Sequence, residues 1–294
     1  MSYFITIFDV KGTLTEGKYM IKLLAVDLDG TLLKNDKSIS NADFLSLAHL
    51  GENGIYRIAA TGRNMQKVQD VIPDNTPLDY IVFSSGGGIY DWKMGAILVH
   101  EYFQEDISQQ VCNFLLKKDL NFLVFQPIPY NHLFEYHNGA GKCSEFDNYI
   151  ERHLPDCSKL NPERLPDTSG QFMVIIPHEE VLFESIKSEL ELECAGIKVI
   201  RTTSPVDSEF IWIEIFPDPV SKGHGLKWLC DFLSVPYSET AGIGNDYNDL
   251  DMLEFVAYPC VMGNSPASLL ESYPSVTATN NQNGFSEIVK KFGL

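Results

Sequence analysis

Residues 24–33, Leu-Ala-Val-Asp-Leu-Asp-Gly-Thr-Leu-Leu, join an apolar run to a pair of carboxylates. The run over 21–26 is typical of a buried strand, and it gives way to Asp27, Asp29 and then Gly30. Residues two apart in a strand point to the same side. Two carboxylates at a strand end are therefore placed for nucleophilic and acid/base chemistry, or for binding a hard cation. The alternative is a strand followed by an ordinary Asp-Gly turn.

The chain on both sides of its middle region alternates between strand and helix patterns. Strands are predicted at 21–26, 56–61, 80–84, 211–216, 240–244 and 258–262. Helices are predicted at 41–50, 64–72, 222–233 and 285–292. Such alternation is typical of a doubly wound parallel sheet with helices on its faces, which makes the fold class α/β.

The middle region has a different texture, with Pro-rich loops between its predicted strands and helices. We interpret residues 91–210 as a separate α+β domain inserted into the chain. Residues 1–90 and 211–294 then form the core domain. A chain of 294 residues is long enough for two such domains.

The composition excludes several classes of partner. The formal net charge of −18 argues against nucleic acid and anionic membranes, which need a basic surface. Six scattered cysteines without a CxxC pair fit reduced thiols, and no apolar stretch reaches the ~18–20 residues of a membrane span. We therefore expect a cytoplasmic protein whose partner is a small molecule.

A second polar cluster follows the predicted strand at 240–244. Residues 242–252 read Gly-Ile-Gly-Asn-Asp-Tyr-Asn-Asp-Leu-Asp-Met, with five acidic or amide side chains within seven residues. Hard oxygen donors at this density favour Mg²⁺. The alternative is a polar loop that caps a helix.

These motifs, with Thr61-Gly-Arg63 and the Lys222 of Val-Ser-Lys-Gly-His, follow one another in an order that resembles a known family. From Met20 to Leu294 the chain is similar to phosphatases of the haloacid dehalogenase (HAD) superfamily, and in particular to the Cof-type subgroup. The resemblance implies a Rossmann-like HAD core with an inserted C2-type cap. The cap would close over the substrate and supply specificity.

The resemblance assigns roles to the catalytic side chains. Asp27 would attack phosphorus to form an aspartyl-phosphate, and Asp29 would protonate the leaving group and then activate water. Lys222 would neutralise Asp27 and the phosphoryl oxygens from the start of a helix.

Residues that follow the second strand would bind the phosphoryl group. The resemblance implies that the Thr61 hydroxyl and the Gly62 N–H donate to it. Asn248 would also orient ligands there. Arg63 could bind the phosphate or form a structural ion pair, and the sequence leaves both open.

The metal-binding residues implied by the resemblance include one departure from the family. The implied Mg²⁺ site draws on Asp27, Asp29, Asn245, Asp246 and Asp249, with Asp29 giving its backbone carbonyl. Asn245 stands where the family usually has an aspartate that ligates the ion. Either the Asn245 carbonyl ligates a weaker metal site, or Asp246 swings in to replace it.

The resulting hypothesis is Mg²⁺-dependent hydrolysis of a small phosphate monoester, such as a sugar phosphate. Alternatives are a phosphomutase, or a non-catalytic ligand-binding protein, which Asn245 favours. A haloacid dehalogenase is disfavoured because family dehalogenases lack the second Asp. Residues 7–15 echo the first motif, but Lys11 replaces the second carboxylate, so a second active site is not expected there.

Overall fold

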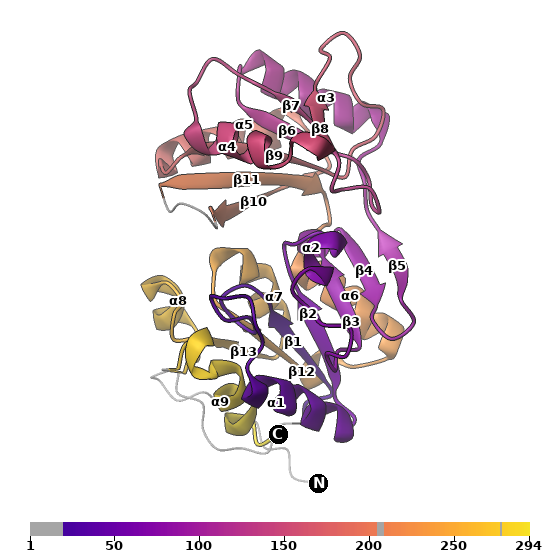
Figure 1. Cartoon of the computed structure of the whole chain (residues 1–294), viewed down its shortest axis with the longest axis vertical. Helices are drawn as coiled ribbons and strands as arrows, with labels where there is room; N and C mark the ends of the chain where they lie inside the picture. Colours follow the sequence, from indigo (N-terminus) through magenta and orange to yellow (C-terminus); the bar gives the residue numbers. More distant parts are fainter. Residues whose placement is uncertain (1–19, 205–208, 277) are drawn as a thin grey trace. The chain divides into compact units, whose positions relative to one another are not determined.

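The computed structural model describes residues 20–204, 209–276 and 278–294, so the echo motif at 7–15 lies outside the described residues (Figure 1). The chain divides into two compact units. One comprises the residues up to 99 together with 221–294, and the other comprises 100–220. The inserted unit thus begins at 100 rather than 91 and ends at 220 rather than 210.

The first unit is built on a seven-stranded sheet in the order β13-β12-β1-β2-β3-β4-β5. Its strands are β1 (Leu23–Asp27), β2 (Tyr56–Ala60), β3 (Tyr80–Phe83), β4 (Gly88–Asp91), β5 (Ala96–His100), β12 (Thr240–Gly244) and β13 (Tyr258–Val261). The pairs that join β13, β12, β1, β2 and β3 are all parallel. This is the α/β core that the sequence predicts.

Helices and short 3₁₀ turns connect these strands. The helices are α1 (Asn41–Glu52), α2 (Met65–Gln69), α6 (Lys222–Leu233), α7 (Leu250–Phe255), α8 (Ala267–Ser272) and α9 (Gly284–Lys291). The 3₁₀ turns are η1 (Ser84–Gly86), η3 (Tyr237–Glu239), η4 (Tyr247–Asp249) and η5 (Asn280–Gln282). Helix α1 begins at an N-cap, Ser40, whose hydroxyl accepts from the Asp43 N–H at 3.0 Å.

Strand β1 lies between β12 and β2 in this sheet, and every one of its residues is buried. Leu23 and Ala25 pack against α6 and α7 through Leu226 and Met252. A strand with parallel neighbours on both sides is covered on both faces, which explains its continuous apolar run. The chain order reverses across β1, since β2 follows on one side and β12 returns on the other. Such a switch point is where open α/β sheets bind ligands.

Two strands account for the difference from the expected boundaries. β4 pairs antiparallel with β3, with Phe83 opposite Gly88, and β5 extends the same sheet. The strand predicted at 211–216, which corresponds to β11 (Phe210–Pro217), pairs antiparallel with β9 (Gln171–Pro177) and β10 (Ile197–Thr203) of the inserted unit. Apolar strand patterns of this length do not reveal which sheet they join.

The second unit is built on a six-stranded sheet in the order β10-β11-β9-β6-β7-β8. Its other strands are β6 (Phe122–Phe125), β7 (Phe134–His137), β8 (Cys157–Lys159), β9 (Gln171–Pro177) and β10 (Ile197–Thr203). Its helices are α3 (Glu105–Lys117), α4 (Ser144–Arg152) and α5 (Glu180–Glu193), with the 3₁₀ turn η2 at Leu154–Asp156. This is the α+β composition that the sequence predicts for the inserted region.

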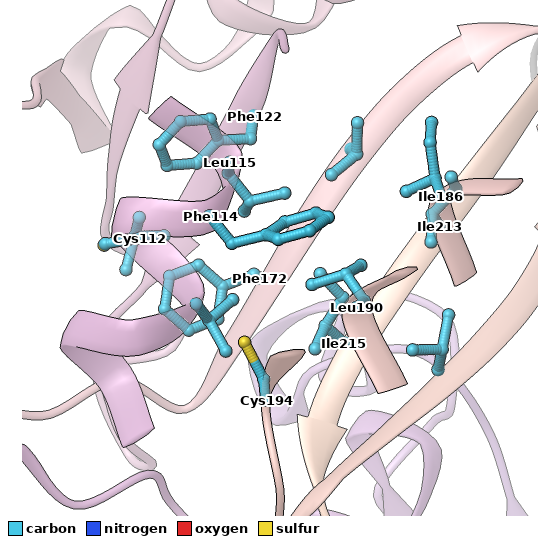
Figure 2. Close-up of a cluster of buried hydrophobic side chains, with 14 of the residues drawn as sticks. Cys112, Phe114, Leu115, Phe122, Phe172, Ile186, Leu190, Cys194, Ile213 and Ile215 are labelled. Carbon is cyan, nitrogen blue, oxygen red and sulfur yellow. The ribbon is translucent and has the colours of Figure 1, made fainter. Parts of the chain in front are cut away.

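One face of this second sheet packs against α3 and α5. Figure 2 shows Phe114 and Leu115 of α3 beside Leu190 of α5, together with Phe172 and Ile213 from the sheet. All five side chains are buried. The unit therefore has an apolar core of its own, as expected for a separate domain.

Among the described residues, the helices are all too short or too polar to cross a lipid bilayer.

Candidate active site

The site forms where β1 and β2 end side by side. Asp27 is the last residue of β1 and lies opposite Ala60 in the parallel register, so Thr61 follows directly on the neighbouring strand. Both side chains are buried, with exposed fractions of 4% for Asp27 and 1% for Thr61. The sheet order places this edge at the switch point beside β12.

Lys222 lies inside this edge rather than on the surface. It is the first residue of α6, and the preceding N-cap, Ser221, accepts a hydrogen bond from the His224 N–H at 3.1 Å. Its Nζ donates to Asp27 Oδ1 at 2.7 Å and to Asp249 Oδ1 at 2.6 Å. Both carboxylates and the ammonium are buried, so these contacts are barely screened by water.

Burial and pairing oppose each other in the pKa values of this cluster. Burial alone lowers the pKa of Lys222, but the Asp249 and Asp27 carboxylates more than reverse this and raise it above its ordinary value. Burial and the nearby Asp249 carboxylate raise the pKa of Asp27 to about 8, although Lys222 opposes the rise. Lys222 therefore stays cationic, and an additional cation beside Asp27 would favour its ionised form.

Asp249 organises the loop after β12. Its Oδ2 accepts the backbone N–H of Asn245 at 2.8 Å and that of Asp246 at 3.1 Å, while its Oδ1 accepts from Lys222. Gly244 is required there, because a Cβ would lie 2.6 Å from the Asp249 side chain. Both carboxylate oxygens thus accept from protein donors, so Asp249 supports the loop, and its part in the metal site stays a prediction.

The side-chain amide of Asn245 points to the end of β1. One of its two terminal atoms lies 2.8 Å from the backbone oxygen of Asp29, 2.8 Å from Thr31 Oγ1 and 3.2 Å from Asp27 Oδ2. Asp246, in contrast, turns its carboxylate to the Tyr247 N–H at 2.8 Å and caps η4. Of the two alternatives that the sequence leaves open, this geometry favours Asn245 as the residue that faces Asp27.

Asp29 is held by two cations. Arg63 donates from Nε to Asp29 Oδ2 at 2.6 Å and from Nη2 to Oδ1 at 2.8 Å, and Lys37 donates to Oδ1 at 2.8 Å. Burial would raise the pKa of Asp29, but hydrogen bonds from Arg63 and then Lys37 outweigh it and lower the pKa below its ordinary value. Arg63 therefore forms an ion pair here, with the residue that the resemblance names as the acid/base group.

The turn after β2 supplies donors at the same edge. The Thr61 hydroxyl accepts from the Arg63 N–H at 3.1 Å, and Gly62 is exposed. Ser85 lies beside them, because its N–H donates to the Thr61 carbonyl at 2.9 Å and a Cβ on Gly62 would lie 3.4 Å from its Oγ. The Ser85 hydroxyl is buried and finds no hydrogen-bond partner within the described part of the chain.

Ser85 and Lys37 are site residues that the sequence analysis does not single out. Ser84 and Ser85 have φ values of 49° and 54°, which are unusual for residues with a side chain. The sequence feature that marks Ser85 is the run of small residues at 84–88 after the third strand. Backbone strain of this kind is concentrated at functional sites. No comparable signal marks Lys37, which reaches Asp29 only because the loop folds back.

Two further candidates occupy the rim of the loop after β1. Asn264 donates from Nδ2 to the Gly30 carbonyl at 2.9 Å, and its Oδ1 accepts from the Asn280 N–H at 3.1 Å. It therefore fixes the backbone that follows Asp29. Asn248 is half-buried in η4, next to Asp249.

The donor set fits a hard divalent cation with few protein charges. Within residues 20–204, 209–276 and 278–294, no group of three or more His, Cys, Asp or Glu side chains is arranged to hold a metal. Asp27 Oδ2, the Asp29 carbonyl and the Asn245 amide oxygen nevertheless converge at 2.8–3.2 Å. Oxygen ligands that leave room for water are the kind that Mg²⁺ accepts. This set contains no thiol or imidazole ligand, the donor types that softer metals prefer.

Comparison with known proteins agrees with this geometry. A model of the haloacid dehalogenase-like hydrolases matches residues 24–289. A putative phosphatase of Streptococcus pyogenes is 27% identical over 93% of this chain and 99% of its own length. A 5-amino-6-(5-phospho-D-ribitylamino)uracil phosphatase of Bacillus subtilis is 25% identical over 92% of this chain and 97% of its own length. The solved structure of a phosphatase of the same superfamily from Bacteroides thetaiotaomicron superimposes with a TM-score of 0.75 and is 20% identical. The match covers 95% of this chain and 97% of the other.

Proposed function

Because the chain belongs to the haloacid dehalogenase-like hydrolases, we propose that it is a metal-dependent phosphatase that hydrolyses small phosphate monoesters. The observation that carries this proposal is the buried Lys222, held between Asp27 and Asp249 at the switch point of the sheet. A cation fixed against a strand-end carboxylate can receive an anion and keep the nucleophile in place.

In the proposed reaction, the Asp27 carboxylate attacks phosphorus while Lys222, bound to its Oδ1, keeps it in place. The bond between phosphorus and the ester oxygen breaks, and Asp29 gives its proton to the leaving alkoxide. Asp29, now ionised, takes a proton from water, and the hydroxide formed attacks the aspartyl-phosphate. This releases inorganic phosphate and restores Asp27.

Three oxygens would hold the metal, namely Asp27 Oδ2, the Asp29 carbonyl and the Asn245 amide oxygen. We propose Mg²⁺, which when bound would screen Asp27 from the anionic ester and stabilise charge on a phosphoryl oxygen. The Lys222 ammonium, the Thr61 hydroxyl and the Gly62 N–H are the chain's own donors for that group.

The charges of the site support a dianionic substrate. Three carboxylates, Asp27, Asp29 and Asp249, are paired with three cations, Lys222, Arg63 and Lys37. The paired groups therefore carry no net charge, although the chain as a whole carries −18. A divalent metal would leave a charge of +2, which matches a phosphate monoester dianion.

We further propose that the substrate is the phosphate of a sugar or polyol. Support comes from the Bacillus subtilis relative, which is named as a phosphatase of 5-amino-6-(5-phospho-D-ribitylamino)uracil. A phosphomutase is less well supported, because the described chain between Leu33 and Thr61 contains only α1 and β2 and no separate cap. A ligand-binding protein without turnover remains the second candidate, since Asn245 lacks the charge of a usual metal ligand.

The direct test is phosphate release from p-nitrophenyl phosphate by the full chain, with Mg²⁺ and with EDTA. We expect turnover that needs the metal and returns when Mg²⁺ is added in excess. Binding of phosphate without turnover at any Mg²⁺ concentration would instead favour the ligand-binding candidate. Turnover that EDTA leaves unchanged would contradict the metal requirement.

Arg63→Gln should change the pH dependence of this turnover. Asp29 must carry a proton to act as an acid, and the Arg63 pair lowers its pKa. Without the guanidinium the pKa of Asp29 should rise, so the alkaline limb of the kcat profile should move to higher pH. The measurement is kcat over the widest pH range in which both proteins stay folded, extended as far as possible to acid pH.

Lys67→Gln is the matched control, because it removes an exposed cation from the neighbouring helix α2. It should leave the alkaline limb in place. If Arg63→Gln raised KM without moving that limb, Arg63 would serve the phosphate and not Asp29. Because the pKa of Asp29 is lowered on folding, the ionised carboxylate stabilises the fold at pH values above its ordinary pKa. This contribution is lost as the pH falls through the lowered pKa. Any loss of stability in Arg63→Gln should therefore shrink towards acid pH.

A further inference from the structure

The Asn245 amide has two possible orientations at the end of β1, and they suit different states of the site. With its nitrogen inward, the amide donates to the Asp29 carbonyl and Thr31 Oγ1 at 2.8 Å and to Asp27 Oδ2 at 3.2 Å. With its oxygen inward, that oxygen faces the acceptors Asp29 O and Asp27 Oδ2, and the nitrogen faces only donors. The second arrangement is unfavourable unless a cation lies among the oxygens.

The spacing of these atoms matches what a cation would require. Adjacent ligands of an octahedral Mg²⁺, with metal–oxygen distances of 2.0–2.1 Å, lie about 2.9 Å apart. The inward amide atom lies 2.8 Å from Asp29 O and 3.2 Å from Asp27 Oδ2. The inward position therefore serves a hydrogen-bond donor in one state and a metal ligand in the other.

The surroundings of the amide accommodate both orientations. The buried Thr31 hydroxyl donates to Asn245 Oδ1 at 2.8 Å when the oxygen is inward, and it can accept from the nitrogen when the amide is reversed. Gly30 leaves the necessary space, since a Cβ there would lie 2.6 Å from the amide. Asp249 holds the Asn245 backbone N–H, so the side chain can turn while the loop stays in place.

We propose that Asn245 is a cation-linked rotor: its amide nitrogen bridges Asp27 and Asp29 in the metal-free protein, and its oxygen replaces the nitrogen when Mg²⁺ binds. This deepens the proposed function and rests on it for the identity of the ion. The amide N–H thus offsets part of the negative charge on Asp27 Oδ2 before the ion arrives. The hydrogen bonds broken on rotation reduce the affinity for Mg²⁺.

An aspartate at this position would behave differently in both states. It could not donate to Asp27, and it would add a carboxylate to a site that already holds Asp27 and Asp249. The metal-free protein should be less stable, because a further like charge lacks a partner. Binding of Mg²⁺ should be tighter, because metal affinity rises with the number of charged ligands.

The test compares wild type, Asn245→Asp and Asn148→Asp as full chains. Mg²⁺ binding is measured by isothermal titration calorimetry, and melting is followed in EDTA and in Mg²⁺. For Asn245→Asp we expect at least about ten-fold tighter Mg²⁺ binding, lower melting in EDTA and a larger rise with Mg²⁺. Asn148→Asp makes the same chemical change on the exposed side of α4 and should match wild type. Unchanged affinity together with unchanged melting of Asn245→Asp in EDTA would overturn the proposal.

A second measurement does not depend on the folding of that variant. In wild type labelled with ¹⁵N-asparagine, the Asn245 side-chain NH₂ pair, identified by its absence in Asn245→Ala, should exchange slowly in EDTA. Saturating Mg²⁺ should shift the pair and speed its exchange with solvent. An NH₂ pair that does not respond to bound Mg²⁺ would refute the rotor. Neither readout uses turnover, so failure of the rotor and failure of the phosphatase proposal are distinguishable.

Discussion

Asp27→Asn should reduce phosphate release by at least about 10⁴-fold while the protein stays folded. An amide oxygen is a far weaker nucleophile than a carboxylate, and no aspartyl-phosphate can form on it. The variant is nearly isosteric, and its Oδ1 can still accept from Lys222, which lies 2.7 Å from that atom in the wild type. Steady-state turnover of p-nitrophenyl phosphate in Mg²⁺ measures the loss.

Stability separates loss of the nucleophile from loss of the fold. Burial and Asp249 raise the pKa of Asp27 to about 8. A group whose pKa is raised on folding contributes stability below its unfolded value, near 4, and loses that contribution as the pH rises through about 8. Asparagine does not ionise, so Asp27→Asn should melt at or above the wild-type temperature in EDTA, and the difference should grow between pH 4 and pH 8.

Asp231→Asn is the control for this change. It alters the same functional group on the exposed side of α6, where Asp231 pairs with Lys227 at 2.7 Å. Turnover and melting should both stay close to wild type. Residual turnover of Asp27→Asn above about one part in a hundred would rule out Asp27 as the nucleophile.

The sequence predicts the core of this fold well because its strands are short, apolar and followed by polar turns. The segments at Leu23–Asp27 and Tyr56–Ala60 became neighbouring parallel strands, and their ends brought Asp27 next to Thr61. Local patterns carry that information, since each strand alternates with a helix. Strands β5 and β11 fall on the other side of the expected boundaries, because sheet membership depends on contacts between distant segments.

In the candidate site, too, local motifs predict some features, and other features depend on contacts between distant residues. The positions of Asp27, Asp29 and Lys222 at element ends could be predicted from local motifs. The hydrogen-bond partners of these side chains could not be predicted in this way, because the contact between Lys222 and Asp27 joins residues 195 positions apart. The Arg63–Asp29 pair, and the Ser85 hydroxyl that has no hydrogen-bond partner among the described residues, likewise depend on how the loops fold over the sheet edge.

Lys222→Met should destabilise the protein as well as slow the reaction. The ammonium is 1% exposed and is the charge that both Asp27 and Asp249 face. Its removal leaves the buried carboxyl groups without their cation, and an uncompensated buried charge typically costs about 3–5 kcal/mol of unfolding free energy. Because Lys222 also supplies positive charge for the phosphoryl group, kcat should fall by more than about 10²-fold. Urea unfolding in EDTA at pH 7 measures the first effect, and turnover in Mg²⁺ the second.

The pH dependence of that loss identifies its cause. The pKa of Lys222 is raised by its carboxylate partners, so its stabilising effect is complete below its ordinary value near 10.4 and is lost only as the pH rises through the raised value. Lys222 is therefore fully charged at pH 7, and Lys222→Met removes its whole contribution there. The penalty should grow as the pH rises above about 8, because the pKa of Asp27 is raised to about 8 and this carboxyl then ionises beside Lys222 in the wild type. Lys227→Met is the matched control, since it removes an exposed lysine of the same helix that pairs with Asp231 and should cost no more than about 0.5 kcal/mol. A penalty that stayed constant from pH 7 to pH 9.5 would mean that lost packing of the lysine stem, and not the loss of the ammonium beside the carboxylates, destabilises the variant.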